Sequence, residues 1–388
     1  PLTRADLPQV LFSEPEALLA ARVEARSGTV TRPALLQLKA NAEQALSAGP
    51  FTVMHKPQTA PTGDKHDYLS LGRYWWPDPD QPDGLPYMQV DGQVNPETLT
   101  IPDKPELQEL IPTVSTLSHA WFVFGDERYA QHAAHLLRTW FLDPETRMNP
   151  NLEYSQIHKG HTDELGGSGI IDARDFATIP GTVGLLKTSS AWTAEDESQL
   201  REWFSEYLDW YLNSPGGREE AATTNNHVTF YWYQALPLLI YTGQDQLVDE
   251  TLTGLLTSSL EDQVAEDGSQ PRELDRSKPF SYSVFNLMAW SRIAMLAEER
   301  GLDLWNHEGP DGNGSLRKAF AFLLPYLSGE EEIVDDPNVP ERPRDFARVL
   351  HRAAVKLQEP TWAELAKSAM GDESALLELD LIVAPETK

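Results

Sequence analysis

Hydrophobic residues recur at helical spacing along most of the chain, and polar, Pro-rich or Gly-rich stretches separate the periodic segments. The alternation expected of half-buried strands is scarce. The pattern therefore predicts an all-α domain of successive helix pairs, whose inner helices present their ends and loops to a central cleft. The predicted helices cover residues 14–26, 33–47, 106–124, 127–141, 195–212, 227–241, 245–262, 281–299, 314–327, 343–357 and 361–370.

Two long irregular stretches, residues 51–103 and 143–180, interrupt these helices. Loops of this length inside a compact domain are usually functional or disordered. Both are rich in side chains that bind sugars, and the second fits a mobile rim or lid. The candidate substrate contacts in the two stretches are His66, Tyr68, Trp75, Trp76, His161 and Arg174. Loop packing is the alternative role for the indole rings, and loop hydrogen bonding is the alternative for the histidines.

The chain has 388 residues, enough to bury a large core, and we predict one domain over residues 1–388. Its 31 basic and 60 acidic residues give a net charge of −29, which argues against a nucleic-acid partner. An anionic ligand would have to meet a local group of basic side chains. Arg272, Arg276 and Lys278 form the candidate group.

The chain contains no cysteine, so disulfides, thiolate catalysis and Cys-based metal sites are excluded. No apolar run is long enough to cross a bilayer, and we expect no membrane insertion. The sequence opens at Pro1 without a signal-like segment, as a processed exported protein or a trimmed chain would. We expect a secreted or periplasmic monomer.

Two weak metal-binding patterns occur. His132 and His135 have helical spacing, but no third ligand stands out nearby, which favours a solvated helix face. Asp78, Asp80 and Asp83 lie among prolines and lack the closing Glu of a calcium loop, which favours a simple turn. We therefore predict no metal and no cofactor.

Thr224-Asn225-Asn226-His227 stands where a polar loop runs into the apolar stretch 228–241. This pattern predicts a helix N-terminus, where free N–H groups and the helix dipole favour an anion. The side-chain amides, with the guanidinium of Arg276 or Arg272, can hydrogen-bond a carboxylate. Simple helix capping is the alternative role for the two asparagines.

These side chains suit β-elimination in a 4-linked uronic acid polymer. The reaction removes the C5 proton beside the sugar carboxylate and protonates the departing O4, so the carboxylate charge must be neutralised. Tyr282 can act as base and acid if positive charge from Arg276 lowers the phenol pKa from about 10. His227 can add a donor or act as a base. Core packing is the alternative role for Tyr282.

Several motifs occur in an order that resembles the alginate lyase family of polysaccharide lyases. They are Ala60 to Ser70 followed by Tyr74-Trp-Trp-Pro-Asp-Pro, then Asn225-Asn226-His227, and then Gln270 to Leu287, which contains Arg276 and Tyr282. The resemblance spans about residues 50–330.

The resemblance to the alginate lyase family implies an α/α toroid and metal-independent elimination. It also implies an Asn and a His near the substrate carboxylate, an assisting Arg, and a Tyr as general acid and base. These roles fall on Asn226 or Asn225, His227, Arg276 and Tyr282, with Arg276 preferred over Arg272.

The spacing between Arg276 and Tyr282, with Pro279 between them, is closer to polysaccharide lyase family 38 than to the older alginate lyases. That family includes enzymes acting on glucuronan as well as alginate. The resemblance therefore implies an anionic uronate polysaccharide as substrate, with mannuronate-rich alginate first and glucuronan second.

Two other functions fit the same sequence. Toroids also carry inverting glycoside hydrolases, which use two carboxylic acids. The carboxylates available for that role are Asp163, Glu164, Asp172, Asp175, Glu273 and Asp275. The other possibility is a noncatalytic protein that binds uronate polysaccharides.

Overall fold

The computed structural model describes residues 7, 10–28, 30–161, 167–333 and 342–383. They form two compact units. The terminal unit holds Leu11–Leu38 together with Thr224–Lys388, and the middle unit holds Lys39–Thr223. Both units are predominantly helical, which confirms the predicted all-α class. The assignment of residues 1–388 to one domain stays a prediction.

The terminal unit is built from helices that pack on sequence neighbours, such as α14 on α15, and on distant partners, such as α8 on α12. Its helices are α1 (Pro15–Arg26), α8 (Asn226–Thr242), α9 (Asp245–Leu255), α10 (Glu261–Gln263), α11 (Pro271–Leu274), α12 (Pro279–Glu299), α13 (Leu316–Ser328), α14 (Arg342–Leu357), α15 (Pro360–Met370) and α16 (Ala375–Ile382). Helix α2 (Pro33–Ala45) runs from this unit into the middle unit. A π-helical turn, Leu256–Leu260, joins α9 to α10.

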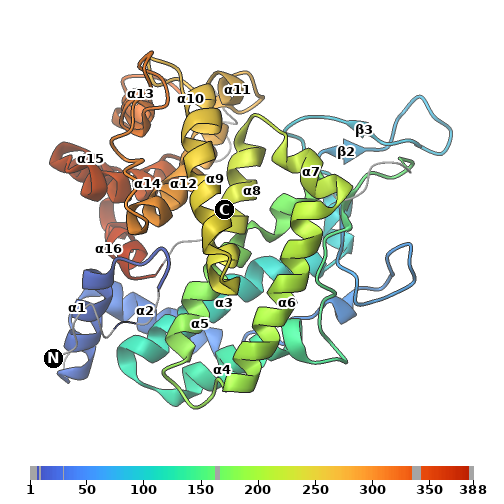
Figure 1. Ribbon diagram of the computed structural model, residues 1–388, viewed down its shortest axis with the longest axis horizontal. Helices are drawn as coiled ribbons and strands as arrows, with labels where there is room; N and C mark the ends of the chain where they lie inside the picture. Colours follow the sequence, from blue (N-terminus) through green and yellow to red (C-terminus); the bar gives the residue numbers. More distant parts are fainter. Residues whose placement is uncertain (1–6, 8–9, 29, 162–166, 334–341, 384–388) are drawn as a thin grey trace. The chain divides into compact units, whose positions relative to one another are not determined.

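Helix α8 lies beside α9 and α12 (Figure 1). Its residues are apolar on nearly every side, so the helix is buried along most of its length. The rings of Phe230 on α8 and Phe285 on α12 stack with their centroids 4.0 Å apart. Gly243 ends α8 with a φ of 81°, a left-handed conformation that glycine adopts without steric cost. The pairing of α8 with α12 positions the candidate site.

The middle unit has helices around a core rich in aromatic rings. Its helices are α3 (Asp103–Phe124), α4 (Glu127–Leu137), α5 (Ile179–Leu186), α6 (Ala194–Asn213) and α7 (Pro215–Ala221). Phe141, Phe176, Trp203 and Tyr207 contact one another at angles typical of aromatic clusters. None of the helices in the described part of the chain combines the length and the apolar character that a bilayer span needs.

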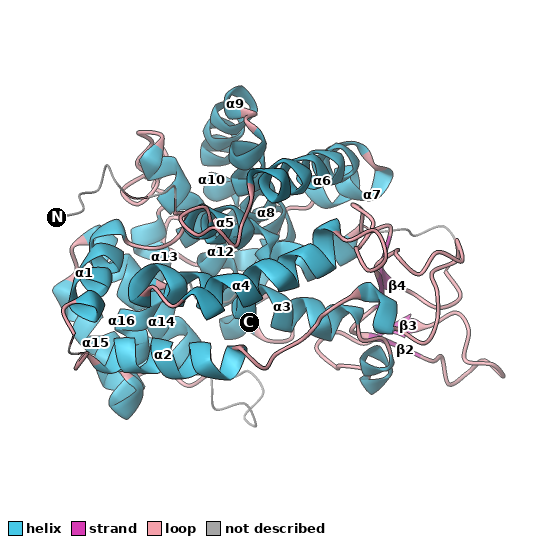
Figure 2. Ribbon diagram, turned by 90° about the horizontal axis from the view of Figure 1, so that it is seen from below, coloured by secondary structure: helices cyan, strands magenta, loops and turns pink. Residues whose placement is uncertain are grey.

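The two stretches predicted to be irregular contain the strands of the described residues. Strand β1 (Leu69–Leu71) pairs in parallel with β4 (Tyr154–Ile157), and Leu69 lies opposite Tyr154. Strand β2 (Trp75–Trp76) pairs antiparallel with β3 (Met88–Gln89). Figure 2 shows β2, β3 and β4 surrounded by loops. The end of the second stretch forms a 3₁₀ segment, Ser168–Thr178. The prediction of irregular structure was wrong there.

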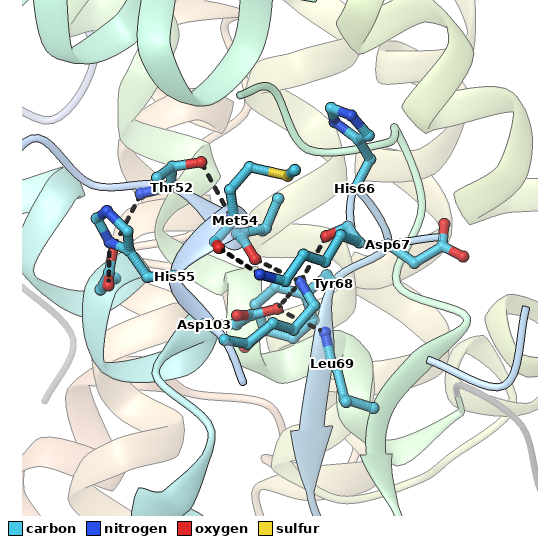
Figure 3. Close-up of polar contacts among 12 residues, drawn as sticks. Thr52, Met54, His55, His66, Asp67, Tyr68, Leu69 and Asp103 are labelled. Atoms are coloured by element: carbon cyan, nitrogen blue, oxygen red, sulfur yellow. Dashed lines mark hydrogen bonds and ion pairs between the residues drawn. The ribbon is translucent and has the colours of Figure 1, made fainter. Parts of the chain in front are cut away.

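A buried ion pair fixes the beginning of the first stretch to α3. The Lys56 ammonium donates to Asp103 Oδ2 at 2.8 Å and to the carbonyl oxygens of Val53 and Lys65 at 2.7 and 2.8 Å. Asp103 Oδ2 also accepts the Leu69 backbone N–H at 2.9 Å (Figure 3). Both charged side chains are 0% exposed. Burial raises the pKa of Asp103, while the charge of Lys56 opposes the rise.

Most of the predicted helices are present, and the misses have physical causes. Helix α5 was missed because all of its residues are buried, so it has no polar face and no helical period. Helix α7 is short and begins with Pro215-Gly-Gly, which favours a turn by local propensity. Helix α16 lies beyond the last predicted helix.

We predict that Lys56→Met destabilises the protein by about 3 to 5 kcal/mol, because it leaves the Asp103 carboxylate buried without its partner. Urea or thermal unfolding followed by circular dichroism measures this loss. Lys39→Met serves as the matched control, since Lys39 is exposed on α2. Equal stabilities for the two variants would contradict the structural role of the ion pair.

A second prediction concerns His119 on α3, which is 4% exposed and donates from Nδ1 to the Ser115 carbonyl oxygen at 2.7 Å. Burial lowers the pKa of its imidazole to about 4. The unfolded state therefore binds the proton more tightly, and stability present above about pH 6.5 is lost as the pH falls toward 4.

We expect His119 to account for up to about 3 kcal/mol of that acid-induced loss. Melting curves recorded between neutral pH and the folded-state pKa should show a smaller decrease for His119→Gln than for the wild type. His135→Gln, on the exposed face of α4, is the control and should follow the wild type. Identical pH profiles for all three proteins would rule out this contribution.

Candidate active site

Helix α8 begins at the asparagine pair, as the sequence predicts. Asn225 is the N-cap, and its Oδ1 accepts the His227 backbone N–H at 3.1 Å. Asn226 is the first residue of the helix and is 2% exposed. Its backbone N–H donates to Glu273 Oε1 and its Nδ2 donates to Glu273 Oε2, both at 2.6 Å. Both asparagines therefore help to fix the start of the helix.

The Glu273 carboxylate lies at the N-terminus of α8. The sequence predicts an anion at this helix end, and the structure places an internal one there. Burial raises the pKa of Glu273, while the hydrogen bonds from Asn226 and the charges of Arg276 and His227 oppose the rise. The backbone N–H of Asn226 is therefore already engaged by this internal carboxylate.

Arg276 and Tyr282 contact each other at the beginning of α12. The guanidinium carbon of Arg276 lies 4.0 Å from the centroid of the Tyr282 ring, a cation–π contact. Both side chains are half-buried. The backbone N–H of Arg276 also donates to the Glu273 carbonyl oxygen at 3.2 Å. A series of contacts therefore runs from Asn226 through Glu273 and Arg276 to Tyr282.

His227 belongs to the same neighbourhood, since it follows Asn226 on α8 and its charge acts on Glu273. The four residues predicted to be catalytic thus lie close to one another within the terminal unit. Their roles in a reaction stay predictions.

A buried network of amide side chains joins the start of α8 to α12. Gln263 Nε2 donates to the Asn225 carbonyl oxygen at 3.1 Å. Gln263 Oε1 accepts from Asn286 Nδ2 at 2.9 Å and from Trp290 Nε1 at 2.8 Å. These three α10 and α12 side chains are buried. Because hydrogen bonds are directional, the network fixes the Asn225 backbone against α12.

Arg272 has internal partners. Its guanidinium contacts the Asp262 carboxylate at 2.8 Å and donates to the Asp262 carbonyl oxygen at 2.8 Å. Arg276 contacts the ring of Tyr282. The preference for Arg276 over Arg272 as the assisting arginine stays a prediction.

The remaining predicted substrate contacts lie in the middle unit, where each of them contacts other residues of the chain. His66 Nδ1 lies 2.6 Å from the Arg147 carbonyl oxygen. Tyr68 is 0% exposed, and its hydroxyl donates to Asp172 Oδ2 at 3.2 Å. Burial, together with the charge of Asp172, raises the pKa of Tyr68 well above its ordinary value. The structure gives Tyr68 a structural role beside β1 in place of the predicted sugar contact, because no part of its ring reaches the surface.

Trp75 forms an aromatic group with two histidines. Its ring stacks on that of His158 with centroids 3.8 Å apart, and the His161 ring meets it edge-on at 4.9 Å. His161 Nε2 lies 2.8 Å from the Tyr87 carbonyl oxygen. The group joins the two stretches that the sequence predicts to be loops.

Trp76 and Arg174 also have partners within the middle unit. Trp76 Nε1 donates to the Gln93 carbonyl oxygen at 2.9 Å. Arg174 donates to the Ile171 carbonyl oxygen at 3.3 Å, and its Nε lies 3.9 Å from the Asp175 carboxylate. Trp76 and Arg174 remain half-buried. Their contact with a substrate stays a prediction.

Two of the carboxylates considered for a hydrolase are engaged in buried internal contacts. Asp172 is buried and accepts hydrogen bonds from Ser70, Lys104 and Gln156 at 2.6 to 2.7 Å. Burial alone would raise its pKa, but the Lys104 charge and these hydrogen bonds lower it. Glu273 is engaged with Asn226. Asp163 and Glu164 lie outside the described residues.

The two weak metal-binding patterns are the His132–His135 pair and the Asp78–Asp83 turn. In the described part of the chain, no group of three or more His, Cys, Asp or Glu residues could hold a metal ion. His132 Nε2 lies 2.9 Å from the Ala48 carbonyl oxygen, and the Asp78 and Asp83 carboxylates accept backbone N–H groups of their own turn.

Sequence reasoning missed the partners of the asparagines. Glu273 was considered only as a hydrolase carboxylate, and Gln263 and Asn286 were not considered. Glu273 lies within the motif that contains Arg276, but neither its burial nor its pairing with Asn226 leaves a signal in the sequence. The same holds for Gln263.

Comparison with known proteins identifies the family. The family model described as Alginate lyase matches residues 52–333. Among solved structures, an alginate lyase from Bacteroides ovatus is 33% identical, with a TM-score of 0.90, over 98% of this chain and 100% of that chain. Alginate lyase A1-III from Sphingomonas species A1 is 16% identical, with a TM-score of 0.58, over 97% of this chain and 98% of that chain.

A variant of alginate lyase A1-III complexed with a tetrasaccharide is 17% identical, with a TM-score of 0.63, over 97% of this chain and 98% of that chain. No curated protein matches the chain. The likeness to these structures confirms the predicted helical toroid fold. With a matching family model over most of its length and a solved relative at 33% identity, the chain belongs to the alginate lyase family of polysaccharide lyases.

Proposed function

We propose that this polysaccharide lyase cleaves β-1,4-linked uronate polymers, either mannuronate-rich alginate or glucuronan, by metal-independent β-elimination. The observation that carries the proposal is the series of contacts from Asn226 through Glu273 and Arg276 to Tyr282. It brings an amide donor, a cation and a phenol into one neighbourhood. Those are the groups that the reaction requires.

The first requirement is to neutralise the sugar carboxylate. Asn226 has one Nδ2 proton bound to Glu273 and a second that can donate to the substrate. His227 and Arg276 add positive or donor groups nearby. Donors fixed before the substrate arrives stabilise the enolate-like transition state, because they need little reorganisation during the reaction.

The second requirement is proton transfer. The Arg276 guanidinium on the ring face of Tyr282 stabilises negative charge on the phenolate. Tyr282 then takes the C5 proton, the C4–O4 bond breaks with its electron pair going to O4, and the same phenol returns the proton to O4. The products are a new reducing end and a sugar with a C4=C5 double bond conjugated to its carboxylate.

Stereochemistry supports the substrate choice. In β-D-mannuronate and β-D-glucuronate the C5 proton and O4 lie on the same side, so one phenol can perform both transfers. In guluronate the proton has to leave from the opposite face. The structure of alginate lyase A1-III complexed with a tetrasaccharide supports an oligosaccharide substrate for this fold.

We predict that Tyr282→Phe lowers kcat by about 10²- to 10⁴-fold, because the general acid and base is lost. KM and the melting temperature should change little, since only the hydroxyl is removed. The rate is measured from the ultraviolet absorbance of the unsaturated product. Tyr326→Phe, a half-buried tyrosine on α13 of the same unit, is the matched control.

A Tyr282→Phe protein with near-normal turnover would remove the phenol from the mechanism. A wild-type protein that releases new reducing ends without ultraviolet absorbance would instead indicate hydrolysis. Binding of oligosaccharides without any product would identify a noncatalytic protein.

A substrate panel tests the stereochemical part of the proposal. Initial rates should be highest on polymannuronate or glucuronan and lowest on polyguluronate, because one phenol reaches only protons on the side of O4. Each polymer is supplied at the same uronate concentration, and product absorbance is followed. Fastest cleavage of polyguluronate would contradict the single-phenol mechanism.

A further inference from the structure

Glu273 makes a contact that the proposed reaction does not itself require. It is 2% exposed and accepts hydrogen bonds from both the backbone N–H and the side-chain Nδ2 of Asn226, each at 2.6 Å. A buried carboxylate is costly unless hydrogen bonds or charges compensate it. Because both Glu273 carboxylate oxygens bind Asn226, they fix the position of that residue and the rotation of its side chain.

We propose that Glu273 is a positioning residue that orients the Asn226 amide toward the carboxylate of the bound sugar. The inference rests on the proposed function and adds to it a residue that does not touch the substrate.

The orientation follows from hydrogen-bond chemistry. An ionised carboxylate only accepts, so the Asn226 atom facing Glu273 Oε2 has to be Nδ2 and not Oδ1. With one Nδ2 proton bound, the direction of the second is determined by the planar amide. If Glu273 did not hold the amide, rotation by half a turn would exchange the donor and the acceptor.

Burial raises the pKa of Glu273, whereas the hydrogen bonds from Asn226 and the charges of Arg276 and His227 oppose the rise and favour the ionised form. Its segment is anchored as well, since Gln270, the residue before α11, accepts from Asn286 Nδ2 at 2.8 Å and donates to the Ser283 carbonyl oxygen at 3.1 Å. Helix α11, which contains Glu273, is therefore anchored to α12 through Gln270, while the Glu273 carboxylate holds the start of α8.

Glu273→Gln tests the proposal with little change in shape. A glutamine amide replaces one of the two acceptor oxygens by an NH₂ donor, so it cannot accept the two Asn226 protons on separate oxygens as Glu273 does. Either one hydrogen bond is lost or the Asn226 amide rotates. We expect kcat to fall on the order of 10- to 100-fold, as a misplaced group does, with KM changed by less than about threefold. A residue with only a structural role would lower stability and not separate kcat from KM in this way.

A double-mutant cycle with Asn226→Ala shows whether Glu273 acts through the asparagine. In the Asn226→Ala background, Glu273→Gln should lower kcat by less than about threefold, because no amide remains to be oriented. Glu266→Gln removes one carboxylate from an exposed position nearby and is the control for charge. Rates are normalised to the folded fraction, which is measured by circular dichroism at the assay temperature. Glu273→Asp is a second variant, which keeps the charge but has a shorter side chain.

The proposal is overturned if Glu273→Gln retains kcat within about threefold of the wild type, or if its effect multiplies fully with that of Asn226→Ala. It is also overturned if Glu273→Asp, once folded, is as active as the wild type. Failure of the proposed function gives a different result, since the wild-type protein itself would then form no unsaturated product.

Discussion

The contact between the Glu273 carboxylate and Asn226 determines the arrangement of the candidate site. Two residues 47 positions apart in the sequence are joined by two short hydrogen bonds in a buried setting. Breaking these bonds would leave a buried carboxylate and amide without hydrogen-bond partners, which costs free energy. The contact therefore couples the two segments. The Gln263 network secures the same helix start through the Asn225 carbonyl oxygen. Asn226 is thus held through its own amide and through its neighbour's backbone.

A strongly acidic chain needs local attractive groups to recognise an anionic sugar. The net charge of −29 repels polyuronates at long range, so attraction has to be local. Glu273 occupies the helix end that would otherwise attract anions, and the charges of Arg276 and His227 act on its carboxylate. Arg276 in turn contacts the ring of Tyr282. The cationic and amide groups that we propose for the substrate carboxylate therefore lie around one buried acid.

The sequence predicts those parts of the structure that depend on local rules. The start of α8 was predictable because Asn capping followed by an apolar run is a local pattern. The proximity of Arg276 to Tyr282 was predictable from the family motif. Glu273 as the partner of Asn226 was not, since a single long-range polar pair leaves no periodic signal. Tyr68 was misjudged because an aromatic residue in a Pro-rich stretch looks the same in sequence whether it is buried or exposed. Helix α5 was not predicted, because complete burial removes the polar face that reveals an amphipathic helix.

The buried ammonium of Lys56 also affects how the protein responds to chemical modification. Three acceptors bind its Nζ and none of its side chain is exposed. Amine-directed reagents used for dye labelling or immobilisation will therefore acylate lysines such as the exposed Lys39 and spare Lys56. Attachment of the protein to a support through its lysines consequently leaves the Lys56–Asp103 ion pair of the first stretch chemically intact.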